Sequence, residues 1–486
     1  MQLSLSIMTT VCIRLAAQTS AFDSPNVLLI IADDLGVANV GAYTRGTAPD
    51  PGDPPPTPTI DDLSSNGVLF RDAWATPVCS STRAATYTGR YGFRNGVRSV
   101  VQTGVDPLPL DETIFPELLS NAGYANALVG KWHLGVGNPV GGLDAARVAG
   151  FDHYSGAPSG GLPDYSSWLK VVDGIANVEN GYATTVNVDD ALAWIELQSA
   201  PWTCTVAFNA PHSPFHDPPQ ELHSFDLTIA DDTLRYKAMI EAMDTEIDRL
   251  LDGLGTHAAN TLIIFVGDNG TPQPVLEAPY TTGKGDIFEG GIRVPFIIAG
   301  PMIASPNRES FELVHVVDIF ATILDATSAS FPNTNLDGVS LAPLLLDASA
   351  TLDREFIYTE YIPSDVQSGR FAIRDDRFKL IQQVNGFRFY DLQTDPFESD
   401  NLLTNHILTT NEQFRYDALL AELGRLREDL CKTDLNSDGT IDAADAALFA
   451  ETIEEDNLQL GDRNGDGSVD LLDYALMQTE GGNECW

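Results

Sequence analysis

The sequence predicts an α/β fold in which helices cover both faces of an open, mostly parallel sheet. Two continuous runs of branched apolar residues, at 26–32 and 261–267, are typical of central strands that are buried on both sides. Similar runs occur at 203–209 and 294–299. Between them, residues 231–254 carry apolar side chains at helical spacing. Strands that alternate with helices in this way build a sheet layered between helices.

The later part of the chain predicts a smaller α+β subdomain. Short segments at 356–360, 371–374, 378–383 and 387–390 are separated by Gly or Asp turns, as in an antiparallel meander. Residues 410–413 (TNEQ) form a capping box that begins a helix to residue 430, with Phe414 and Leu419 on its apolar side. We therefore expect a main domain at 23–348, this subdomain at 349–430 and a separate module at 431–486.

Charge and hydropathy exclude several classes of protein. The 486 residues include 69 Asp and Glu against 27 Lys and Arg, which gives a net charge of −42. Nucleic-acid binding is not expected, because neutralising phosphates requires clustered basic residues. No apolar run reaches the roughly 18–20 residues of a membrane span. Residues 1–22 combine an apolar stretch with small residues at 19–21, which predicts a signal peptide and a secreted, periplasmic or cell-surface protein.

The C-terminal module contains a twelve-residue acidic loop twice. Such a loop offers Ca²⁺ oxygen ligands from places 1, 3, 5, 7, 9 and 12, with Gly at place 6. Glycines 439 and 467 stand at place 6 of the two copies. The ligands of the first loop are Asp434, Asn436, Asp438, the Thr440 carbonyl, Asp442 and Asp445. Those of the second are Asp462, Asn464, Asp466, the Ser468 carbonyl, Asp470 and Asp473. Two bound calcium ions are therefore predicted.

Asp at place 12, two loops in tandem and the C-terminal position resemble the dockerin module, over residues 431–486. The resemblance implies a cohesin-like scaffold as partner. In the dockerin family, partner choice depends partly on the residues at places 10 and 11. Here these places hold Ala443-Ala444 and Leu471-Leu472 rather than hydroxyl residues. Cys431 and Cys485 bracket the module, and a disulfide between them would contribute on the order of 4 kcal/mol. Two free thiols are the alternative.

Polar side chains follow two of the predicted central strands. Asp33 and Asp34 come after the first strand, and Asp268 and Asn269 come after the strand at 261–267. The carboxyl ends of strands form the ligand site in open α/β sheets. Four oxygen ligands suit calcium or magnesium rather than zinc, which prefers His and Cys. Ordinary turn roles are the alternative for each pair alone.

Cys79 lies in a polar stretch, Cys79-Ser80-Ser81-Thr82-Arg83, which Thr88-Gly89-Arg90 follows. If the next residues are helical, Cys79 lies at the amino end of that helix, where free N–H groups favour an anion. A buried structural thiol is the common alternative. We interpret Cys79 as a nucleophile that attacks an anionic group.

These motifs together resemble the sulfatase family, over about residues 25–428. In chain order they are Asp33-Asp34, the Cys79 and Thr88 motifs, Gly130-Lys131-Trp132-His133-Leu134-Gly135, Pro211-His212, Asp268-Asn269-Gly270, Gly283-Lys284-Gly285 and 289–295 (EGGIRVP). The resemblance implies an alkaline-phosphatase-like fold and a sulfuric ester hydrolase of the arylsulfatase type. It implies that a maturation enzyme oxidises Cys79 to formylglycine (3-oxoalanine), whose hydrate attacks sulfur and then releases sulfate.

The resemblance also assigns roles to individual residues. It implies one catalytic Ca²⁺, with Mg²⁺ possible, on Asp33, Asp34, Asp268 and Asn269, and Cys79 as a further ligand after oxidation. Five further residues are assigned to the reacting groups. Arg83 and Lys131 hold the diol, and His133 orients or deprotonates it or assists the later elimination of sulfate. His212 protonates the leaving oxygen, and Lys284 binds a sulfate oxygen.

Two other functions stay open from the sequence. A phosphate or phosphonate ester hydrolase on the same fold would share the tetrahedral anion and the cation. A catalytically inactive binding component of a scaffolded complex would work through its calcium module alone. Ser81 stands where the commonest motif has Pro or Ala, which leaves acceptance by the maturation enzyme open. The substrate is expected to be a sulfated small molecule or glycan, which the sequence does not specify further.

Overall fold

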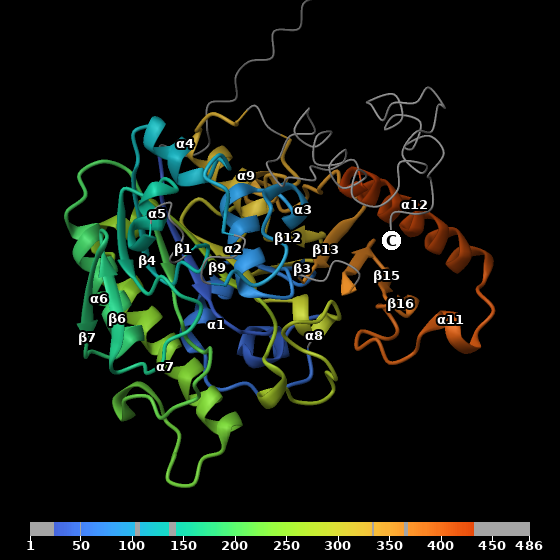
Figure 1. The fold of residues 1–486 in the computed structure, drawn as a ribbon, viewed down its shortest axis with the longest axis horizontal. Helices are drawn as coiled ribbons and strands as arrows, with labels where there is room; N and C mark the ends of the chain where they lie inside the picture. Colours follow the sequence, from blue (N-terminus) through green and yellow to red (C-terminus); the bar gives the residue numbers. More distant parts are fainter. Residues whose placement is uncertain are drawn as a thin grey trace, which may run out of the picture.

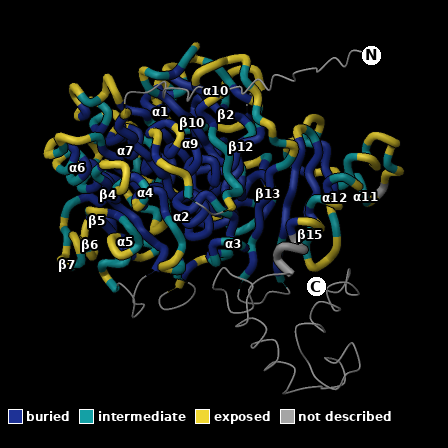
Figure 2. Tube along the Cα trace, turned by 90° about the horizontal axis from the view of Figure 1, so that it is seen from above, coloured by how far each residue is buried: buried dark blue, intermediate teal, exposed yellow. Residues whose placement is uncertain are grey.

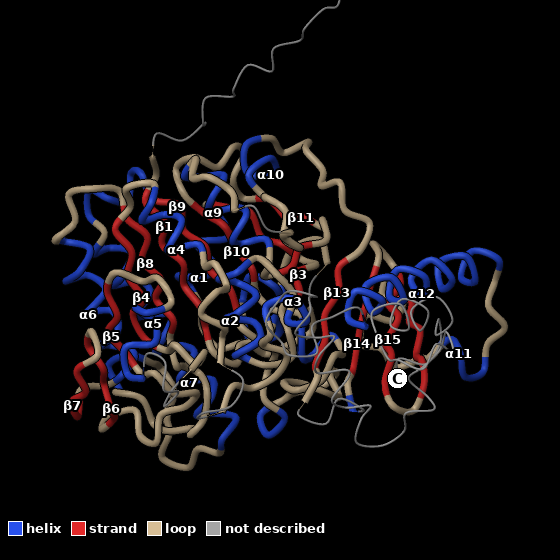
Figure 3. The backbone as a smooth tube through the Cα atoms, turned by 45° about the horizontal axis from the view of Figure 1, so that its top comes forward, coloured by secondary structure: helices blue, strands red, loops and turns tan. Residues whose placement is uncertain are grey.

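The computed structural model describes residues 24–48, 50–102, 107–135, 142–332, 335–363 and 368–431. A ten-stranded sheet forms its centre, in the order β11-β2-β10-β9-β1-β8-β4-β5-β6-β7. In that order the strands are Arg308–Ser310, Gly67–Phe70, Phe296–Ala299, Thr261–Gly267, Asn26–Ala32, Trp202–Ala207, Ala125–Gly130, His153–Gly156, Trp168–Val172 and Ile175–Glu179. Figure 3 shows these strands lying between helices.

The five central strands β9, β1, β8, β4 and β5 are parallel, whereas the flanks are mixed. Strand β10 runs antiparallel to both β9 and β2, and β6 and β7 form an antiparallel edge hairpin. The predicted α/β fold is confirmed, with a mostly parallel centre. The predicted segments 26–32 and 261–267 coincide with β1 and β9.

Alternate residues of β1 enter two separate cores, one on each face of the sheet. Val27, Leu29 and Ile31 pack with helices α2 (Cys79–Thr88), α4 (Phe115–Asn121), α5 (Ala145–Val148), α9 (Asp318–Thr327) and α10 (Ala342–Leu346). Leu28 and Ile30 pack with α1 (Pro58–Ser65), α6 (Ala183–Glu196) and α7 (Asp232–Gly253). Both faces of the strand are therefore buried, as predicted from its run of apolar residues without alternating polar ones. Figure 2 shows buried residues throughout this centre.

A second, four-stranded antiparallel sheet forms the C-terminal subdomain. Its strands in order are β13 (Ile357–Tyr361), β14 (Arg370–Arg374), β15 (Phe378–Gln383) and β16 (Gly386–Asp391). Helices α11 (Leu402–Asn405) and α12 (Thr410–Cys431) complete it, and Figure 1 shows them at the opposite end of the molecule from α6. The predicted meander is present.

Two details of α12 differ from the sequence prediction. The capping box is formed by Thr409 and Glu412, one residue earlier than predicted: the Glu412 N–H donates to Thr409 Oγ1 at 3.3 Å, and the Thr409 N–H donates to Glu412 Oε2 at 2.7 Å. Phe414 is 68% exposed, so the buried side of α12 begins later and includes Leu419 and Leu423.

Short elements connect these parts. They are the parallel pair β3 (Ala73–Trp74) and β12 (Val314–His315), and helices α3 (Gly92–Asn95) and α8 (Glu289–Ile292). None of the described helices combines the length and the apolar composition that a membrane span requires. The predicted signal peptide at 1–22 and the two predicted calcium loops lie outside the described residues.

Candidate active site

The acidic residues meet because two parallel strands end in register. Ala32 of β1 pairs with Gly267 of β9, so Asp33 and Asp268 follow at the same edge of the sheet. The Asp268 N–H donates to the Ala32 carbonyl at 2.9 Å, and the Asp34 N–H donates to Asp268 Oδ1 at 3.0 Å. The Asn269 amide donates to Asp34 Oδ1 at 2.8 Å. The structure thus brings all four predicted oxygen ligands together.

Asp34 adopts a backbone conformation that side chains other than Gly rarely take, with φ of 69°. Its carbonyl accepts a hydrogen bond of 2.7 Å from the buried Tyr236 hydroxyl on α7. The contacts of its carboxylate with Asn269 and Lys284 hold the residue in this conformation. Outliers of this kind persist where surrounding contacts determine them, and they cluster at functional sites.

Three cations contact the three carboxylates. Lys131 Nζ lies 2.5 Å from Asp33 Oδ2, and Arg83 Nη2 lies 2.8 Å from Asp268 Oδ2, with all four side chains fully buried. Lys284 Nζ lies 2.6 Å from Asp34 Oδ1, and the Lys284 side chain is 20% exposed. Lys284 is therefore the one of these three cations that also reaches solvent.

Neighbouring cations lower the pKa values of two of these carboxyls, although burial alone would raise them. Burial raises the pKa of Asp33, but the charges of Lys131, His212 and Arg83 together outweigh it and hold that pKa below its ordinary value. The pKa of Asp34 is likewise lowered, because Lys284 and His212 outweigh burial. Burial and the neighbouring Asp33 charge raise the pKa of Asp268. Asp33 and Asp34 are therefore held as carboxylates, the form that binds a cation.

Two buried oxygens of this cluster have no hydrogen-bond partner among the described residues. They are Asp33 Oδ1 and Asn269 Oδ1. Leaving such atoms unpaired costs about 1–3 kcal/mol each, so they are expected to have a ligand. In addition, ligand atoms of Asp33, Cys79 and Asp268 all lie within 4.8 Å of one another. An oxygen-rich, carboxylate-dominated donor set of this kind fits calcium or magnesium.

Cys79 is the first residue of α2, and both the residue and its helix are buried. Its Sγ lies 3.2 Å from His133 Nδ1. Burial raises the pKa of the thiol above its ordinary value, although Lys131 lowers it. This environment does not favour a thiolate, so Cys79 in its unmodified form is a poor nucleophile.

The hydrogen bonds of His133 define its tautomer. Its Nε2 lies 3.1 Å from the Val101 carbonyl, which can only accept, so Nε2 carries the proton. Burial, together with Lys131 and Arg83, lowers the pKa of His133 well below its ordinary value. The neutral ring therefore presents the lone pair of Nδ1 to the group at position 79.

His212 lies on the solvent side of the carboxylates. Its Nδ1 donates to the Ser213 carbonyl at 2.7 Å, and its Nε2 lies 3.9 Å from Asp34 Oδ2. The His212 side chain is 21% exposed, similar to Lys284. These two residues mark the open side of the cluster.

Two glycines that the sequence analysis did not single out as site residues shape the site. A Cβ on Gly130 would lie 2.0 Å from the Ala207 carbonyl oxygen, and Gly130 has φ of 103°, so only Gly lets the chain turn before Lys131. A Cβ on Gly160 would lie 2.4 Å from His133 Nε2. The Gly- and Pro-rich run at 155–161 (SGAPSGG) signals a tight loop, but not that it covers a histidine.

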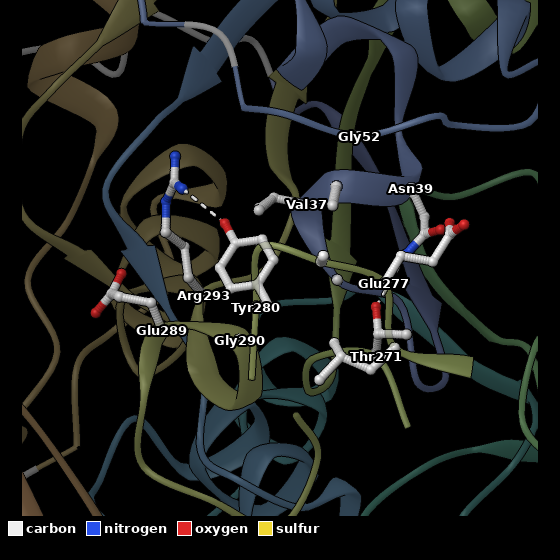
Figure 4. A pocket seen from close by; sticks show the side chains of 13 residues that line it. Val37, Asn39, Gly52, Thr271, Glu277, Tyr280, Glu289, Gly290 and Arg293 are labelled. Atoms are coloured by element: carbon white, nitrogen blue, oxygen red, sulfur yellow. Dashed lines mark hydrogen bonds between the residues drawn. The ribbon is translucent and has the colours of Figure 1, made fainter. Parts of the chain in front are cut away.

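A separate water-sized cavity of about 20 Å³ is lined by the segments that follow Asp34 and Asn269 (Figure 4). Gly36, Asn39, Thr271, Tyr280 and Glu289 are among the residues that line it. The Asn39 amide donates to Thr271 Oγ1 at 2.9 Å. The cavity is too small for a substrate and belongs to the support of the site.

Comparison with known proteins identifies this arrangement. The sequence profile of the sulfatase domain matches residues 25–329, and that of the N-sulphoglucosamine sulphohydrolase C-terminal domain matches 283–425. The chain belongs to the sulfatase family. Residues 432–480 of this sulfatase match the dockerin type I domain, which agrees with the predicted C-terminal module.

Named relatives agree with this membership. The sulfatase is 29% identical to bovine arylsulfatase A over 82% of each chain. It is 30% identical to human N-acetylgalactosamine-6-sulfatase, over 69% of this chain and 68% of the relative. The crystal structure of Ps i-CgsB superposes with a TM-score of 0.73 at 25% identity, over 88% of this chain and 97% of that one. The sulfatase is accordingly a sulfuric ester hydrolase.

Proposed function

We propose that this sulfatase is secreted and hydrolyses sulfate esters of a sulfated carbohydrate, with a formylglycine made from Cys79 as its nucleophile. The observation that carries the proposal is that a helix start, carboxylate ligand atoms and a neutral histidine nitrogen all lie next to position 79. Cys79 lies at the amino end of α2, within 4.8 Å of carboxylate ligand atoms and 3.2 Å from the His133 lone pair. Sulfatases typically use formylglycine and Ca²⁺, and the hydrated aldehyde supplies a hydroxyl nucleophile that the buried thiol does not.

The residues that would hold the catalytic cation are Asp33, Asp34, Asp268 and Asn269, with position 79 as a further ligand after oxidation. The unpaired oxygens of Asp33 and Asn269 and the lowered pKa values of Asp33 and Asp34 support this assignment. Calcium is the preferred ion, and magnesium would suit the same donors. When bound, the cation supplies positive charge that polarises the sulfate and lowers the pKa of the attacking hydroxyl.

Three buried residues act on the nucleophile. Arg83 and Lys131 bring positive charge to the reacting oxygens, which stabilises the negative charge that develops on them. Arg83 is itself oriented by Asp268 and by the Lys131 carbonyl, at 2.8 and 3.0 Å. His133 holds a neutral Nδ1 toward position 79, where it accepts the proton of the attacking hydroxyl.

Two residues at the open side act on the ester. Lys284 binds a sulfate oxygen, and its partial exposure lets it reach an incoming group. His212 in its doubly protonated form donates the Nε2 proton to the leaving oxygen and becomes neutral, while its Nδ1 proton stays hydrogen-bonded to the Ser213 carbonyl. Proton donation prevents the alkoxide of a sugar from leaving as an unstable anion.

A sulfated glycan is the proposed substrate class. The name of the human relative refers to a sulfated amino sugar, and the family profile over 283–425 is named for another. The chain's charge of −42 opposes approach of a long polyanion, so short substrate ends or saline conditions are favoured. The cations of the site would attract the sulfate locally.

The C-terminal module is proposed to bind two calcium ions and to attach the enzyme to a cohesin-like scaffold. Dockerin modules bind calcium and occur in extracellular proteins, which supports both the scaffold role and secretion. The loops Asp434 to Asp445 and Asp462 to Asp473 would supply the ligands. A maturation enzyme that accepts Ser81 is required as a further partner. Ser81 is buried, and its Oγ lies 2.5 Å from Thr76 Oγ1.

The test compares hydrolysis of matched esters by the full chain produced together with a formylglycine-generating enzyme. Aryl sulfate, aryl phosphate and a panel of defined sulfated sugars are scored by release of inorganic sulfate or phosphate. Release of sulfate from sugars supports the proposal. Preferential cleavage of the phosphate ester assigns a phosphatase instead, and no cleavage of any ester assigns an inactive binding component.

A further inference from the structure

We propose that Arg370, Lys379 and Glu398 of the C-terminal subdomain are positioning residues, which hold the loop at 283–289 so that Lys284 faces the substrate sulfate. This inference rests on the proposed role of Lys284. The four-stranded sheet contacts that loop at two points, one on each side of its turn. Neither point includes a residue that touches the reacting groups.

The first point is Arg370, at the start of β14. Its Nη1 donates to the Gly285 carbonyl at 3.1 Å and lies 3.4 Å from Asp286 Oδ1. The guanidinium also lies over the Tyr361 ring, 5.1 Å from its centroid. Gly285 directly follows Lys284, and its N–H donates to the Pro77 carbonyl at 2.8 Å, two residues before Cys79. Arg370 therefore fixes the backbone at Gly285, directly beside Lys284.

The second point is a buried cluster of one lysine and two glutamates. Lys379 Nζ on β15 lies 3.0 Å from Glu289 Oε1 and 2.7 Å from Glu398 Oε1, with all three side chains at most 4% exposed. Glu398 Oε2 also accepts the Glu289 N–H at 2.6 Å. Trp74 Nε1 donates to Glu289 Oε1 at 3.1 Å, and Lys379 Nζ lies 4.8 Å from the centre of the Trp74 ring.

Glu289 is the first residue of α8, and α8 touches the cation site. The Gly270 N–H donates to the Gly291 carbonyl at 2.9 Å, directly after Asn269. A Cβ on Gly270 would lie 1.9 Å from the Gly290 carbonyl oxygen, so the two segments are in closest backbone contact. Fixing Glu289 thus fixes one end of the Lys284 loop and the backbone behind Asn269.

The main domain anchors the other side of this turn. Figure 4 shows Glu289 and Gly290 next to Tyr280 and Arg293. Arg293 contacts Asp50 with two hydrogen bonds of 2.6 and 3.1 Å. The turn is therefore held between the main domain and the C-terminal sheet.

A contribution to folding stability does not by itself explain the Lys379 cluster, because well-packed apolar residues can often replace a buried ion pair without loss of stability.

Glu398 offers a variant that is expected to fold. Burial raises the pKa of Glu398 to about 7, although Lys379 lowers it, so a neutral side chain at this position costs little folding free energy, and the activity is measured at about pH 8.5, where Glu398 is ionised. Glu398→Gln keeps the size of the side chain and an oxygen acceptor for the Glu289 N–H, but weakens the attraction to Lys379. Lys379→Met would instead leave two buried carboxylates without their lysine and is expected to unfold.

The experiment is a double-mutant cycle in the matured full chain, read out as kcat/KM for an aryl sulfate and as melting temperature. Arg370→Ala and Glu398→Gln are each combined with Lys284→Ala. We expect each to lower kcat/KM about tenfold when Lys284 is present and to change it little in the Lys284→Ala background, because both act through Lys284. Arg370→Lys, which keeps a donor for Gly285, is expected to recover most of the loss.

The control is Arg249→Ala, which removes a partly exposed arginine of α7 that pairs with Asp189 and Glu246. It should leave kcat/KM unchanged in both backgrounds. Equal losses with and without Lys284, or no loss in either variant, would overturn the positioning role. If Lys284→Ala itself leaves activity intact, the proposed role of Lys284 fails instead.

Discussion

Cys79 Sγ and His133 Nδ1 lie 3.2 Å apart in a buried site, and the other ring nitrogen of His133 is committed to the Val101 carbonyl. The histidine is held neutral by burial and by neighbouring cations, which lower its pKa. A neutral nitrogen that faces a buried thiol of raised pKa does not make a thiol enzyme. The same nitrogen facing the hydrated aldehyde of a formylglycine would serve as a base.

Replacing Cys79 separates this account from a structural role for the thiol. Cys79→Ala is expected to remove sulfate-ester hydrolysis entirely and to leave the melting temperature within a few degrees of wild type. Cys204→Ala is the matched control, because Cys204 is an equally buried thiol, in strand β8. It should keep full activity. Comparable activity losses in the two variants would point to packing rather than chemistry.

Asn269→Ala is expected to weaken the catalytic calcium site by at least about tenfold, because it removes one oxygen ligand and leaves Asp34 without its amide contact. Calorimetric titration with calcium measures the effect. The titration uses a chain in which Asp438→Ala and Asp466→Ala disable the C-terminal loops. Asn385→Ala, at an exposed turn between β15 and β16, serves as control. Equal affinities in the two variants would exclude Asn269 as a ligand.

Calcium stoichiometry tests the C-terminal module. The full chain is expected to bind three ions, one at the catalytic cluster and two in the loops at 434–445 and 462–473. Asp438→Ala with Asp466→Ala should reduce the count to one and leave aryl sulfate hydrolysis unchanged. Counting bound metal after gel filtration, by elemental analysis, provides the measurement. Loss of hydrolysis in this variant would show that the loops support the catalytic domain.

Glu360 predicts a pH dependence of stability. Burial raises the pKa of Glu360 from its ordinary 4.5 to about 7, although the Tyr358 hydroxyl opposes the rise. The folded chain keeps this proton between pH 4.5 and 7, while the unfolded chain loses it. The free energy of unfolding should therefore fall by about 3 kcal/mol as pH rises through that window.

Chemical denaturation at pH 4.5 and 7.5 measures this loss. Glu360→Gln removes the titrating group and should reduce the difference between the two pH values by most of that amount. Glu355→Gln, an exposed residue on the same segment, should reproduce the wild-type difference. A wild-type difference that persists in the Glu360 variant would assign it to other groups.

Asp244 links two helices on one face of the sheet. Its carboxylate on α7 accepts the Thr59 and Ile60 N–H groups of α1, at 3.0 and 2.9 Å. Asp244→Ala leaves both donors unpaired and is expected to lower the free energy of unfolding by about 2 kcal/mol. Asp248→Ala, at an exposed position one turn further along α7, should change it by less than about 0.5 kcal/mol. Similar losses in both would argue against the link.

The central strands were predictable because burial on both faces leaves a direct signature. Runs such as 26–32 contain no alternation, and the structure places their successive residues in opposite cores. The charged strand β11 and the edge hairpin of β6 and β7 carry no such signature, since solvent covers much of them. Main-chain pairing positions these strands together with a few side-chain contacts, such as those of buried Trp168 and Val171 in β6 and the pair between Glu309 of β11 and Arg71.

The site was predictable in part from the residues alone. The acidic pairs at strand ends and the position of Cys79 at a helix start follow from local pattern. The places of Lys131, His133, His212 and Lys284 came from the family resemblance, because a single lysine or histidine in a loop has no pattern of its own. The support that Lys379 gives from another subdomain depends on tertiary contact, which local sequence does not encode.

The most direct test is the mass of the peptide that contains position 79, from the full chain produced together with a formylglycine-generating enzyme. We predict that the thiol is replaced by an aldehyde, with loss of sulfur and two hydrogens and gain of one oxygen, and that sulfate release from the test esters rises with the modified fraction. An unmodified thiol in protein that nonetheless hydrolyses sulfate esters would contradict the account.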